Sequence, residues 1–321
     1  MKLLRLAFAD SPQRIALSAL LLTIGLLPAA AAQEQSQPSS KAEQSDPLTG
    51  VPSVPFRWLP IKNGPERGAL LVPIELDGRH YSFQLDTGAD GTILYGAEAA
   101  RWGWKKGDRD VRVPNVRLGA LQIPAAKLAV LLDMPTPLGD AAGTVGLDLL
   151  LGATVVIDYP RQRFAVLPRA DAPSSLLRPA ARAPGVIRNG KFFIAVKLNG
   201  TEVDDLFFDS GSSAFPLMVD FERWKALTGL PDERAATSQF RGTSWGKAIT
   251  FPGAPALGAL EIGGVKIDHP LVYFRASEPS HFKEFPFKAG GAIGNAPFWN
   301  RIVVLNLGVH PSLGLLEPPR L

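Results

Sequence analysis

Two short stretches of this chain repeat one another: Phe83-Gln84-Leu85-Asp86-Thr87-Gly88 and Leu206-Phe207-Phe208-Asp209-Ser210-Gly211. Each is an apolar run that ends in Asp, a small hydroxyl residue and Gly. One tripeptide of this kind is usually a loop, because Asp and Gly favour turns. Two of them, in matching places of two similar halves, predict a pair of carboxyl groups that face each other.

The parts around these turns follow the same order in both halves. Each half opens with two apolar runs joined by a tight turn: residues 68–76 and 81–85 flank Asp77-Gly78, and residues 191–198 and 203–208 flank Asn199-Gly200. Asp-Gly and Asn-Gly between alternating apolar residues predict β-hairpins. After each Asp turn we expect an apolar strand and then a short helix, at residues 92–94 and 97–102 in the first half and at 215–219 and 220–227 in the second.

The later parts of the halves also match. Leu118-Gly-Ala-Leu-Gln-Ile is nearly identical to Leu257-Gly-Ala-Leu-Glu-Ile, and Val145-Gly146 matches Ile293-Gly294. Twelve residues after these glycines come Asp158 and Asn306. An internal repeat of this kind predicts gene duplication and a pseudo-two-fold structure. The short strands, broken by Gly and Pro, favour a mainly β fold of two similar β-barrel-like lobes with short helices.

The first 32 residues have the pattern of a secretory signal peptide. Arg14 closes a basic start, residues 15–27 form an apolar run of 13 residues, and Ala30-Ala31-Ala32 offers a cleavage site. A membrane span needs about 20 apolar residues, so this run is short for one. We expect cleavage and export, either secretion or, if the source is a Gram-negative bacterium, delivery to the periplasm. An uncleaved anchor is the alternative.

Composition and the repeat divide the remaining chain into four segments. Residues 33–55 are rich in Gln, Ser, Pro and Glu and predict a flexible tether. Residues 169–189 are rich in Ala, Pro and Arg and predict a linker between the lobes. The first lobe then covers residues 56–168, and the second covers residues 190–321.

Composition also excludes several classes of function. The 321 residues include no Cys, which excludes disulfides, thiolate catalysis, zinc–thiolate sites and a lipid anchor on Cys. The four His have no metal-ligand spacing, and we predict neither a metal nor a cofactor. The net charge is +4 and no block of Lys and Arg stands out, so binding to nucleic acid is not supported.

The quoted residues resemble those of the aspartic peptidases. Residues 85–94, Leu-Asp-Thr-Gly-Ala-Asp-Gly-Thr-Ile-Leu, are similar to the active-site stretch of the retropepsins. Val145-Gly146 and Ile293-Gly294 are similar to the hydrophobic element with Gly that packs beside the catalytic loop in that fold. Two such lobes in one chain are similar to the pepsin arrangement. The resemblance covers roughly residues 66–168 and 190–318 and implies a central cleft with Asp86 and Asp209 at its floor.

The physical chemistry of the two turns supports the same roles. Gly88 and Gly211 allow one backbone to approach another, and the hydroxyls of Thr87 and Ser210 can bond across to the opposite turn. Two adjacent carboxyl groups resist ionising together, so the pair holds one proton. The ionised carboxylate takes a proton from water while the protonated one polarises the peptide carbonyl, and no metal or organic cofactor is required.

The residue after each of these glycines breaks the symmetry, because it is Ala89 in the first half and Ser212 in the second. A hydroxyl at this position can donate to its Asp and stabilise the anion. The sequence therefore predicts that Asp209 is ionised and that Asp86 holds the proton. We expect a pH optimum less acidic than that of pepsin-like enzymes with hydroxyls on both sides.

The second half also carries an insertion around residues 238–251, which predicts a β-hairpin with Gly242 and Gly246 at its tip. We interpret it as a flap that closes over substrate, with Trp245 as an apolar contact; a plain surface hairpin is the alternative. In pepsins the flap belongs to the first lobe, but here residues 107–117 are short and lack Gly near a tip.

Asp90 is a further candidate for substrate binding. The matching acid of the retropepsins contacts the substrate backbone and is supported by an Arg, but Leu147-Asp148 stands at that place here. A solvated acid in a turn is the alternative for Asp90.

The sequence as a whole predicts a monomeric aspartic endopeptidase that acts on peptide or protein substrates with water activated between Asp86 and Asp209. The alternative is a catalytically inactive pepsin-like protein that binds a peptide or another ligand in the same cleft. A glycosidase fits poorly, because its carboxylates need not follow a repeated turn. Residues 290–294 are rich in Gly, but no Lys-Ser or Lys-Thr follows, which excludes a phosphate-binding loop.

Overall fold

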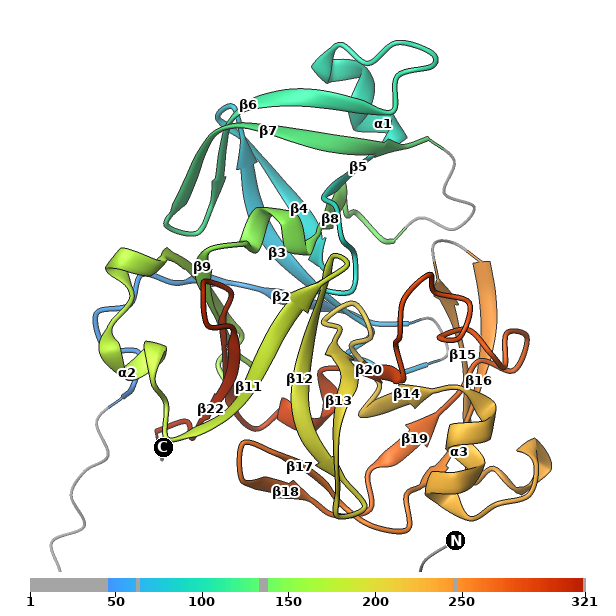
Figure 1. Ribbon diagram of the computed structural model, residues 1–321. Helices are drawn as coiled ribbons and strands as arrows, with labels where there is room; N and C mark the ends of the chain where they lie inside the picture. Colours follow the sequence, from blue (N-terminus) through green and yellow to red (C-terminus); the bar gives the residue numbers. More distant parts are fainter. Residues whose placement is uncertain (1–45, 62–63, 133–137, 245–246, 320–321) are drawn as a thin grey trace, which may run out of the picture. The chain divides into compact units, whose positions relative to one another are not determined.

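The computed structural model describes residues 46–61, 64–132, 138–244 and 247–319. Within these residues the protein is mainly β and its helices are short, as the sequence predicts (Figure 1). Each half of the repeat forms a lobe, and strands from both halves pair with one another between the lobes.

The first lobe is a small closed β-barrel. Its strands pair in the order β2-β3-β4-β8-β5-β7-β6, and a further pairing of β3 with β6 closes the ring. Every second residue of β3 from Leu70 to Leu76 is buried and fills the barrel. The strands are β2 (Arg57–Leu59), β3 (Ala69–Leu76), β4 (Arg79–Leu85), β5 (Ile93–Tyr95), β6 (Asp110–Leu118), β7 (Leu121–Leu131) and β8 (Gly143–Val145), and the helices are α1 (Gly96–Ala99), η1 (Ala100–Trp102) and η2 (Leu147–Leu150).

The second lobe follows the same plan with one addition. Its strands pair in the order β12-β13-β20-β14-β19-β16-β15, while β17 pairs with β12 and β18 pairs with β17. The strands are β12 (Lys191–Leu198), β13 (Thr201–Phe208), β14 (Leu217–Val219), β15 (Ser238–Ser244), β16 (Lys247–Pro255), β17 (Leu260–Ile262), β18 (Val265–Ile267), β19 (Leu271–Tyr273) and β20 (Gly291–Ile293), and the helices are α3 (Phe221–Thr228), η4 (Glu233–Ala235) and η5 (Ala296–Phe298). The β15–β16 hairpin is the addition, at the place where the sequence predicts a hairpin.

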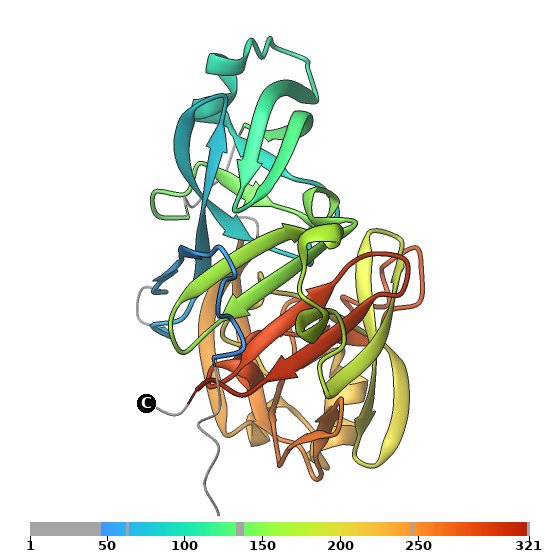
Figure 2. The ribbon, with the colours of Figure 1, turned by 90° about the vertical axis from the view of Figure 1, so that its left-hand side faces the viewer.

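A sheet built from both halves joins the lobes, and its strands pair in the order β1-β10-β9-β21-β22-β11. Strands of the first half, in green, and of the second half, in red, lie side by side in this sheet (Figures 1 and 2). Its strands are β1 (Val54–Pro55), β9 (Ala153–Asp158), β10 (Arg163–Pro168), β11 (Ala181–Arg188), β21 (Ile302–Asn306) and β22 (Ser312–Leu316). The central strands β9 and β21 are antiparallel, and Val156 pairs with Val304 at the middle of their ladder. The pseudo-two-fold axis that the repeat predicts therefore passes between these two valines.

The end of the predicted tether, β1, and the end of the predicted linker, β11, form the two edges of this sheet. Of the tether, residues 46–55 are described; they are packed rather than flexible, because Leu48 and Val51 are buried and β1 pairs with β10. The linker contains the helices η3 (Arg169–Asp171) and α2 (Ser174–Leu177) and then β11, which pairs with β22 and also with β12. Composition missed both strands because a strand at the edge of a sheet tolerates Pro and Gly.

The two predicted hairpin turns are present. Asp77 and Gly78 both have positive φ angles, of 48° and 77°, and Asn199 and Gly200 have φ angles of 50° and 81°. Positive φ at both central residues gives the type of two-residue turn that matches the twist of the flanking strands.

The near-identity of residues 118–123 and 257–262 predicts that the two stretches are equivalent, and this prediction is wrong. In the first lobe, residues 119–120 form the turn between β6 and β7, where Leu118 pairs with Leu121. In the second lobe the equivalent turn is Gly263-Gly264, between Ile262 and Val265. The two stretches therefore do not occupy equivalent places, although both belong to the same region of their lobes.

The predicted signal peptide, residues 1–32, lies outside the described residues. In the part of the chain that the structure covers, no helix is both long enough and apolar enough to span a membrane.

Candidate active site

Two parallel strand pairs bring the repeated turns together. β4 runs parallel to β8 and ends one residue before Asp86, whose N–H donates to the carbonyl of Val145 at 3.0 Å. β13 runs parallel to β20 in the same way, and the N–H of Asp209 donates to the carbonyl of Ile293 at 2.9 Å. Each Asp is thus held at the end of a buried strand of its own lobe.

The hydroxyl residues lock the two turns to each other. The Thr87 Oγ1 hydroxyl donates to the carbonyl of Phe208 at 2.9 Å and accepts from the N–H of Ser210 at 3.0 Å. Ser210 reciprocates, because its hydroxyl donates to the carbonyl of Leu85 and accepts from the N–H of Thr87, both at 3.0 Å. Thr87 and Ser210 are completely buried. Four hydrogen bonds therefore cross between the lobes at this point.

The glycines leave no room for a side chain. A Cβ atom built on Gly88 would lie 2.5 Å from Oδ1 of Asp209, and one built on Gly211 would lie 2.5 Å from Oδ1 of Asp86. Each turn therefore packs its glycine directly against the carboxyl group of the other lobe, which is the close approach that the sequence predicts.

Backbone N–H groups hold both carboxyl groups from below. Oδ1 of Asp86 accepts from Gly88 at 2.9 Å and from Ala89 at 3.0 Å. Oδ1 of Asp209 accepts from Gly211 at 2.9 Å and from Ser212 at 3.2 Å. The Ser212 hydroxyl adds a bond to Oδ2 of Asp209 at 2.7 Å, and Ala89 has no hydroxyl to match it. Hydrogen bonding to the anion is therefore stronger at Asp209.

Burial raises the pKa of Asp86 well above its ordinary value, and the negative charge and hydrogen bond of Asp209 raise it further. These effects outweigh the backbone N–H groups of Ala89 and Gly88, which lower the pKa. Asp86 therefore keeps its proton to a higher pH than an ordinary aspartic acid does.

The two late glycines pack beside the turns. A Cβ on Gly146 would meet the backbone of Gly91 and Thr92, and one on Gly294 would meet the backbone carbonyls of Ser212 and Phe215. The N–H of Gly146 also donates to the Thr92 hydroxyl at 3.0 Å. Each late glycine therefore fixes the loop that follows the Asp of its own lobe.

Asp86 and Asp209 line a cavity of about 1160 Å³. The second lobe contributes an aromatic wall, and the first contributes aliphatic residues together with a few polar ones. The aromatic and neighbouring apolar residues are Phe207, Phe215, Met218, Phe251, Phe282, Phe285 and Ala292; those of the first lobe include Leu59, Pro60, Ile61, Gln84, Asp90, Tyr95 and Leu138.

The β15–β16 hairpin forms part of this cavity. Arg241, Gly242 and Phe251, from its two strands, line the same space as the carboxyl groups. Phe251 packs against Phe215 with ring centroids 4.8 Å apart, which ties the hairpin to the loop after Asp209. The position fits the flap interpretation better than a plain surface hairpin. Trp245 lies outside the described residues, so its predicted contact with substrate stays a prediction.

Asp90 lies at the edge of the cavity, and its side chain is 76% exposed. Its nearest charge is Lys191, whose Nζ lies 4.0 Å from Oδ1 of Asp90. Leu147-Asp148 stands where the retropepsins have the Arg that supports the matching acid. Asp148 instead accepts a hydrogen bond from the Thr92 hydroxyl at 2.6 Å. Asp90 is thus exposed to solvent and also borders the cavity.

Sequence reasoning missed two polar groups in the cavity. The hydroxyl of Tyr95 lies 2.6 Å from Oγ1 of Thr144. Tyr95 follows directly after the predicted strand 92–94, and a half-buried tyrosine needs a partner for its hydroxyl, which is the signal that could have identified it.

The second group is a network formed by Arg275, Glu278 and His281. Nη2 of Arg275 lies 2.6 Å from Oε2 of Glu278, and Nη1 lies 3.2 Å from Nε2 of His281. Burial and then the charge of Arg275 lower the pKa of His281, outweighing the acidic neighbours. A neutral His281 accepts from Arg275, and the network stiffens the loop after β19. The sequence gave no signal for these three residues, because none of them belongs to a recognised motif.

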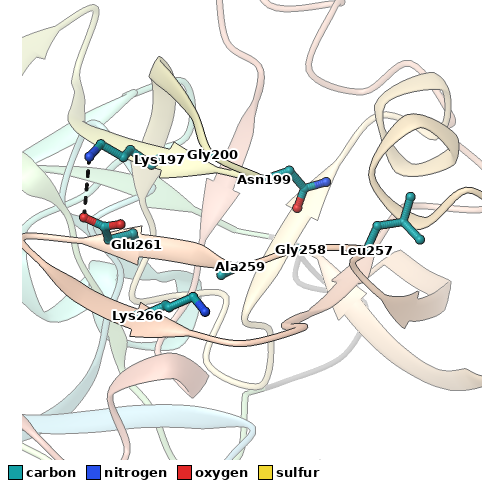
Figure 3. A pocket seen from close by; sticks show the side chains of 8 residues that line it. All are labelled: Lys197, Asn199, Gly200, Leu257, Gly258, Ala259, Glu261 and Lys266. Carbon is teal, nitrogen blue, oxygen red and sulfur yellow. Dashed lines mark ion pairs between the residues drawn. The ribbon is translucent and has the colours of Figure 1, made fainter.

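A smaller cavity of about 350 Å³ lies at the turn of the β12–β13 hairpin (Figure 3). Lys197 pairs there with Glu261 at 3.7 Å, and Lys266 pairs with Asp268 at 2.7 Å. Because its charges are paired and neither carboxyl group of the central pair reaches it, we place the candidate active site in the larger cavity. No group of three or more metal-binding side chains occurs in the described segments.

No protein-family model and no curated protein matches this chain. Among solved structures, the chain is similar to the crystal structure of aspartic proteinase from Irpex lacteus, with a TM-score of 0.46 and 15% sequence identity. The match covers 83% of this chain and 97% of that chain.

Proposed function

We propose that this chain is an aspartic endopeptidase whose catalytic residues are Asp86 and Asp209. The observation that carries the proposal is the paired carboxyl groups, which share a cavity and are held by reciprocal hydrogen bonds between Thr87 and Ser210. A partly buried pair of carboxyl groups with one proton between them supplies an acid and a base at the same place.

In the proposed reaction, the ionised Asp209 takes a proton from a water molecule bound between the two carboxyl groups. Asp86 donates its proton to the oxygen of the peptide carbonyl as the water attacks the carbon, which gives a tetrahedral intermediate with two hydroxyl groups. The proton on Asp209 then passes to the peptide nitrogen, the C–N bond breaks, and one hydroxyl returns its proton to Asp86. The hydrogen bond from Ser212 supports this division of roles, because it stabilises the anion of Asp209.

The proposed substrates are peptides or proteins bound in extended form. The cavity volume of about 1160 Å³ exceeds that of ordinary small-molecule pockets and suits several residues of a peptide. The aromatic wall of the second lobe favours a large apolar side chain next to the scissile bond. The β15–β16 hairpin supplies a wall on the same side, so we propose it as the flap. We further propose that the chain is exported after removal of residues 1–32 and acts as a monomer.

Digestion of a peptide library between pH 3 and 7 tests the proposal. We expect the wild type to cleave, and we expect Asp86→Asn and Asp209→Asn each to lose about 10²- to 10⁴-fold in rate, since each removes the acid or the base. Asp204→Asn is a matched control: Asp204 lies on β13, the strand that leads to Asp209, but it is exposed and does not line the cavity. Cleavage that survives either substitution of the pair would exclude this mechanism.

A non-catalytic peptide-binding protein is the second candidate function. It is favoured by one observation: among the described residues that line the cavity, the flap-like hairpin β15–β16 comes from the second lobe, and β6 and β7 of the first lobe do not line the cavity. Calorimetric binding of library peptides without any cleavage by the wild type would support this candidate.

A further inference from the structure

Tyr95 contributes a hydroxyl group to the wall of the cavity that contains Asp86 and Asp209. Tyr95 is the last residue of β5, it lines the same cavity as Asp86, and its ring is partly buried. Burial raises the pKa of Tyr95, and the negative charge of Asp86 raises it further, while the hydrogen bond with Thr144 lowers it. With a raised pKa, Tyr95 keeps its proton throughout the acidic and neutral range.

The position of that proton follows from its partner. Thr144 Oγ1 lies 2.6 Å from the Tyr95 hydroxyl, and the Thr144 side chain is completely buried. Within the described residues, Tyr95 is the hydrogen-bond partner of this threonine side chain. If Tyr95 donated, the proton of Thr144 would be buried without an acceptor, which costs about 1–3 kcal/mol. Thr144 is therefore the donor, and the proton of Tyr95 is left to point elsewhere.

The open space next to Tyr95 is the cavity, so its O–H is a donor available to whatever binds beside Asp86. The second lobe has no tyrosine and no threonine at the positions equivalent to Tyr95 and Thr144. The register of the strands makes Ala292 the equivalent of Thr144, because Met218 pairs with Ala292 as Ile93 pairs with Thr144. The equivalent of Tyr95 is then Asp220, which accepts from the N–H of Phe282 and does not line the cavity.

We infer that the Tyr95 hydroxyl donates a hydrogen bond to a backbone carbonyl oxygen of the bound peptide, on the side of the cavity that Asp86 occupies. The inference rests on the proposed function in one respect, since it requires a peptide in this cavity. It makes Tyr95 a substrate-binding residue and Thr144 a positioning residue that acts through Tyr95.

A double-mutant cycle on the full chain tests the inference. We expect Tyr95→Phe to lower kcat/KM by about 3- to 12-fold, which is the usual effect of losing one neutral hydrogen bond to a ligand. Thr144→Val keeps the Tyr95 donor but frees its orientation, so we expect a loss of about 2- to 3-fold. The variant with both substitutions should lose no more than Tyr95→Phe alone, and it should fold well because it leaves no unpaired threonine hydroxyl.

A second measurement separates substrate contact from a structural effect. Peptides in which one carbonyl oxygen at a time is replaced by sulfur, a weaker acceptor, should include one position that slows the wild type. At that position Tyr95→Phe should show no further loss. Equal sensitivity of both proteins at every position, or kcat/KM of Tyr95→Phe within about 2-fold of wild type, would overturn the inference.

Failure of the proposed function is recognised separately. If the wild type neither cleaves nor binds the peptides in calorimetry, both the proposed function and the inference are wrong. If the wild type binds without cleaving, the same cycle is measured as Kd, and an unchanged Kd for Tyr95→Phe overturns the inference alone.

Discussion

The two lobes carry the same Asp turn but surround it differently. The first lobe is a closed barrel, follows its turn with Ala89, and offers aliphatic residues and the Tyr95 hydroxyl to the cavity. The second lobe adds the β15–β16 hairpin, follows its turn with Ser212, and offers an aromatic wall. The residues that both lobes share are those that hold the Asp turn in place. The residues that form the two sides of the cavity differ, because the turn does not depend on them.

Thr87 and Ser210 contribute equally to the hydrogen bonds between the two turns. Removing these bonds should have the largest effect on stability. Thr87→Val and Ser210→Ala each leave a buried N–H and a buried carbonyl without a partner, so we expect each to destabilise the fold by about 2–4 kcal/mol. Thr87→Ser and Ser210→Thr keep the hydroxyls and serve as controls. Urea unfolding measures the change. A loss at one turn and none at the other would show that these hydrogen bonds are not reciprocal.

The glycines of the turns come next. Gly88→Ala and Gly211→Ala each place a methyl group 2.5 Å from a carboxyl oxygen of the opposite lobe, so we expect a loss of about 1–3 kcal/mol together with loss of activity. Gly91→Ala is the control in the same loop, because a Cβ there would meet no atom within 4 Å. Thermal unfolding and peptide cleavage report the two effects. Tolerance of either substitution in the central turns would contradict the close packing.

The contribution of Asp86 to the stability of the fold should depend on pH. Its pKa is raised in the folded state, so its favourable contribution is present below the ordinary value of 3.8 and is lost as pH rises through the raised value. Asp86→Asn is neutral at every pH, and we therefore expect its melting temperature to exceed that of wild type at pH 7. The two should converge near pH 3. The exposed control Asp204→Asn should show no such divergence.

The smallest effect should come from the residue after each glycine. Ser212→Ala removes the hydroxyl bond to Asp209, so the acidic limb of the pH–rate profile should move to higher pH. Ala89→Ser adds a hydroxyl beside Asp86, which lowers the pKa of Asp86 and should move the alkaline limb to lower pH. If neither limb moves, the assignment of the proton to Asp86 is wrong.

The sequence was sufficient to predict the turns and hairpins of this protein. The hairpins at Asp77-Gly78 and Asn199-Gly200, the crossed hydroxyls of Thr87 and Ser210, and the inserted hairpin all follow from residue types at fixed positions. Such features depend on local geometry, so a short motif specifies them.

The features that sequence reasoning missed depend on pairing between distant segments. β1 and β11 were predicted as parts of a tether and a linker, because their Pro-rich composition does not reveal that β10 and β22 offer them edges. The alignment of residues 118–123 with 257–262 failed because side-chain pattern alone does not record strand register. Tyr95 and Thr144 lie 49 residues apart, and only the antiparallel pairing of β5 with β8 brings them together.

The ladder between β9 and β21 has a consequence for the origin of the molecule. Because Val156 pairs with Val304 at its centre and the strands run in opposite directions, each half presents the same edge to the other. The join between the lobes is therefore, in chemical terms, an isologous dimer interface contained in one polypeptide. The segment between the lobes adds the strand β11 to this join, because β11 pairs with β22 and with β12, and it also raises the effective concentration of one half near the other. A single ancestral half could have assembled with its own copy through this edge, and fusion then freed each side of the site to acquire its own wall.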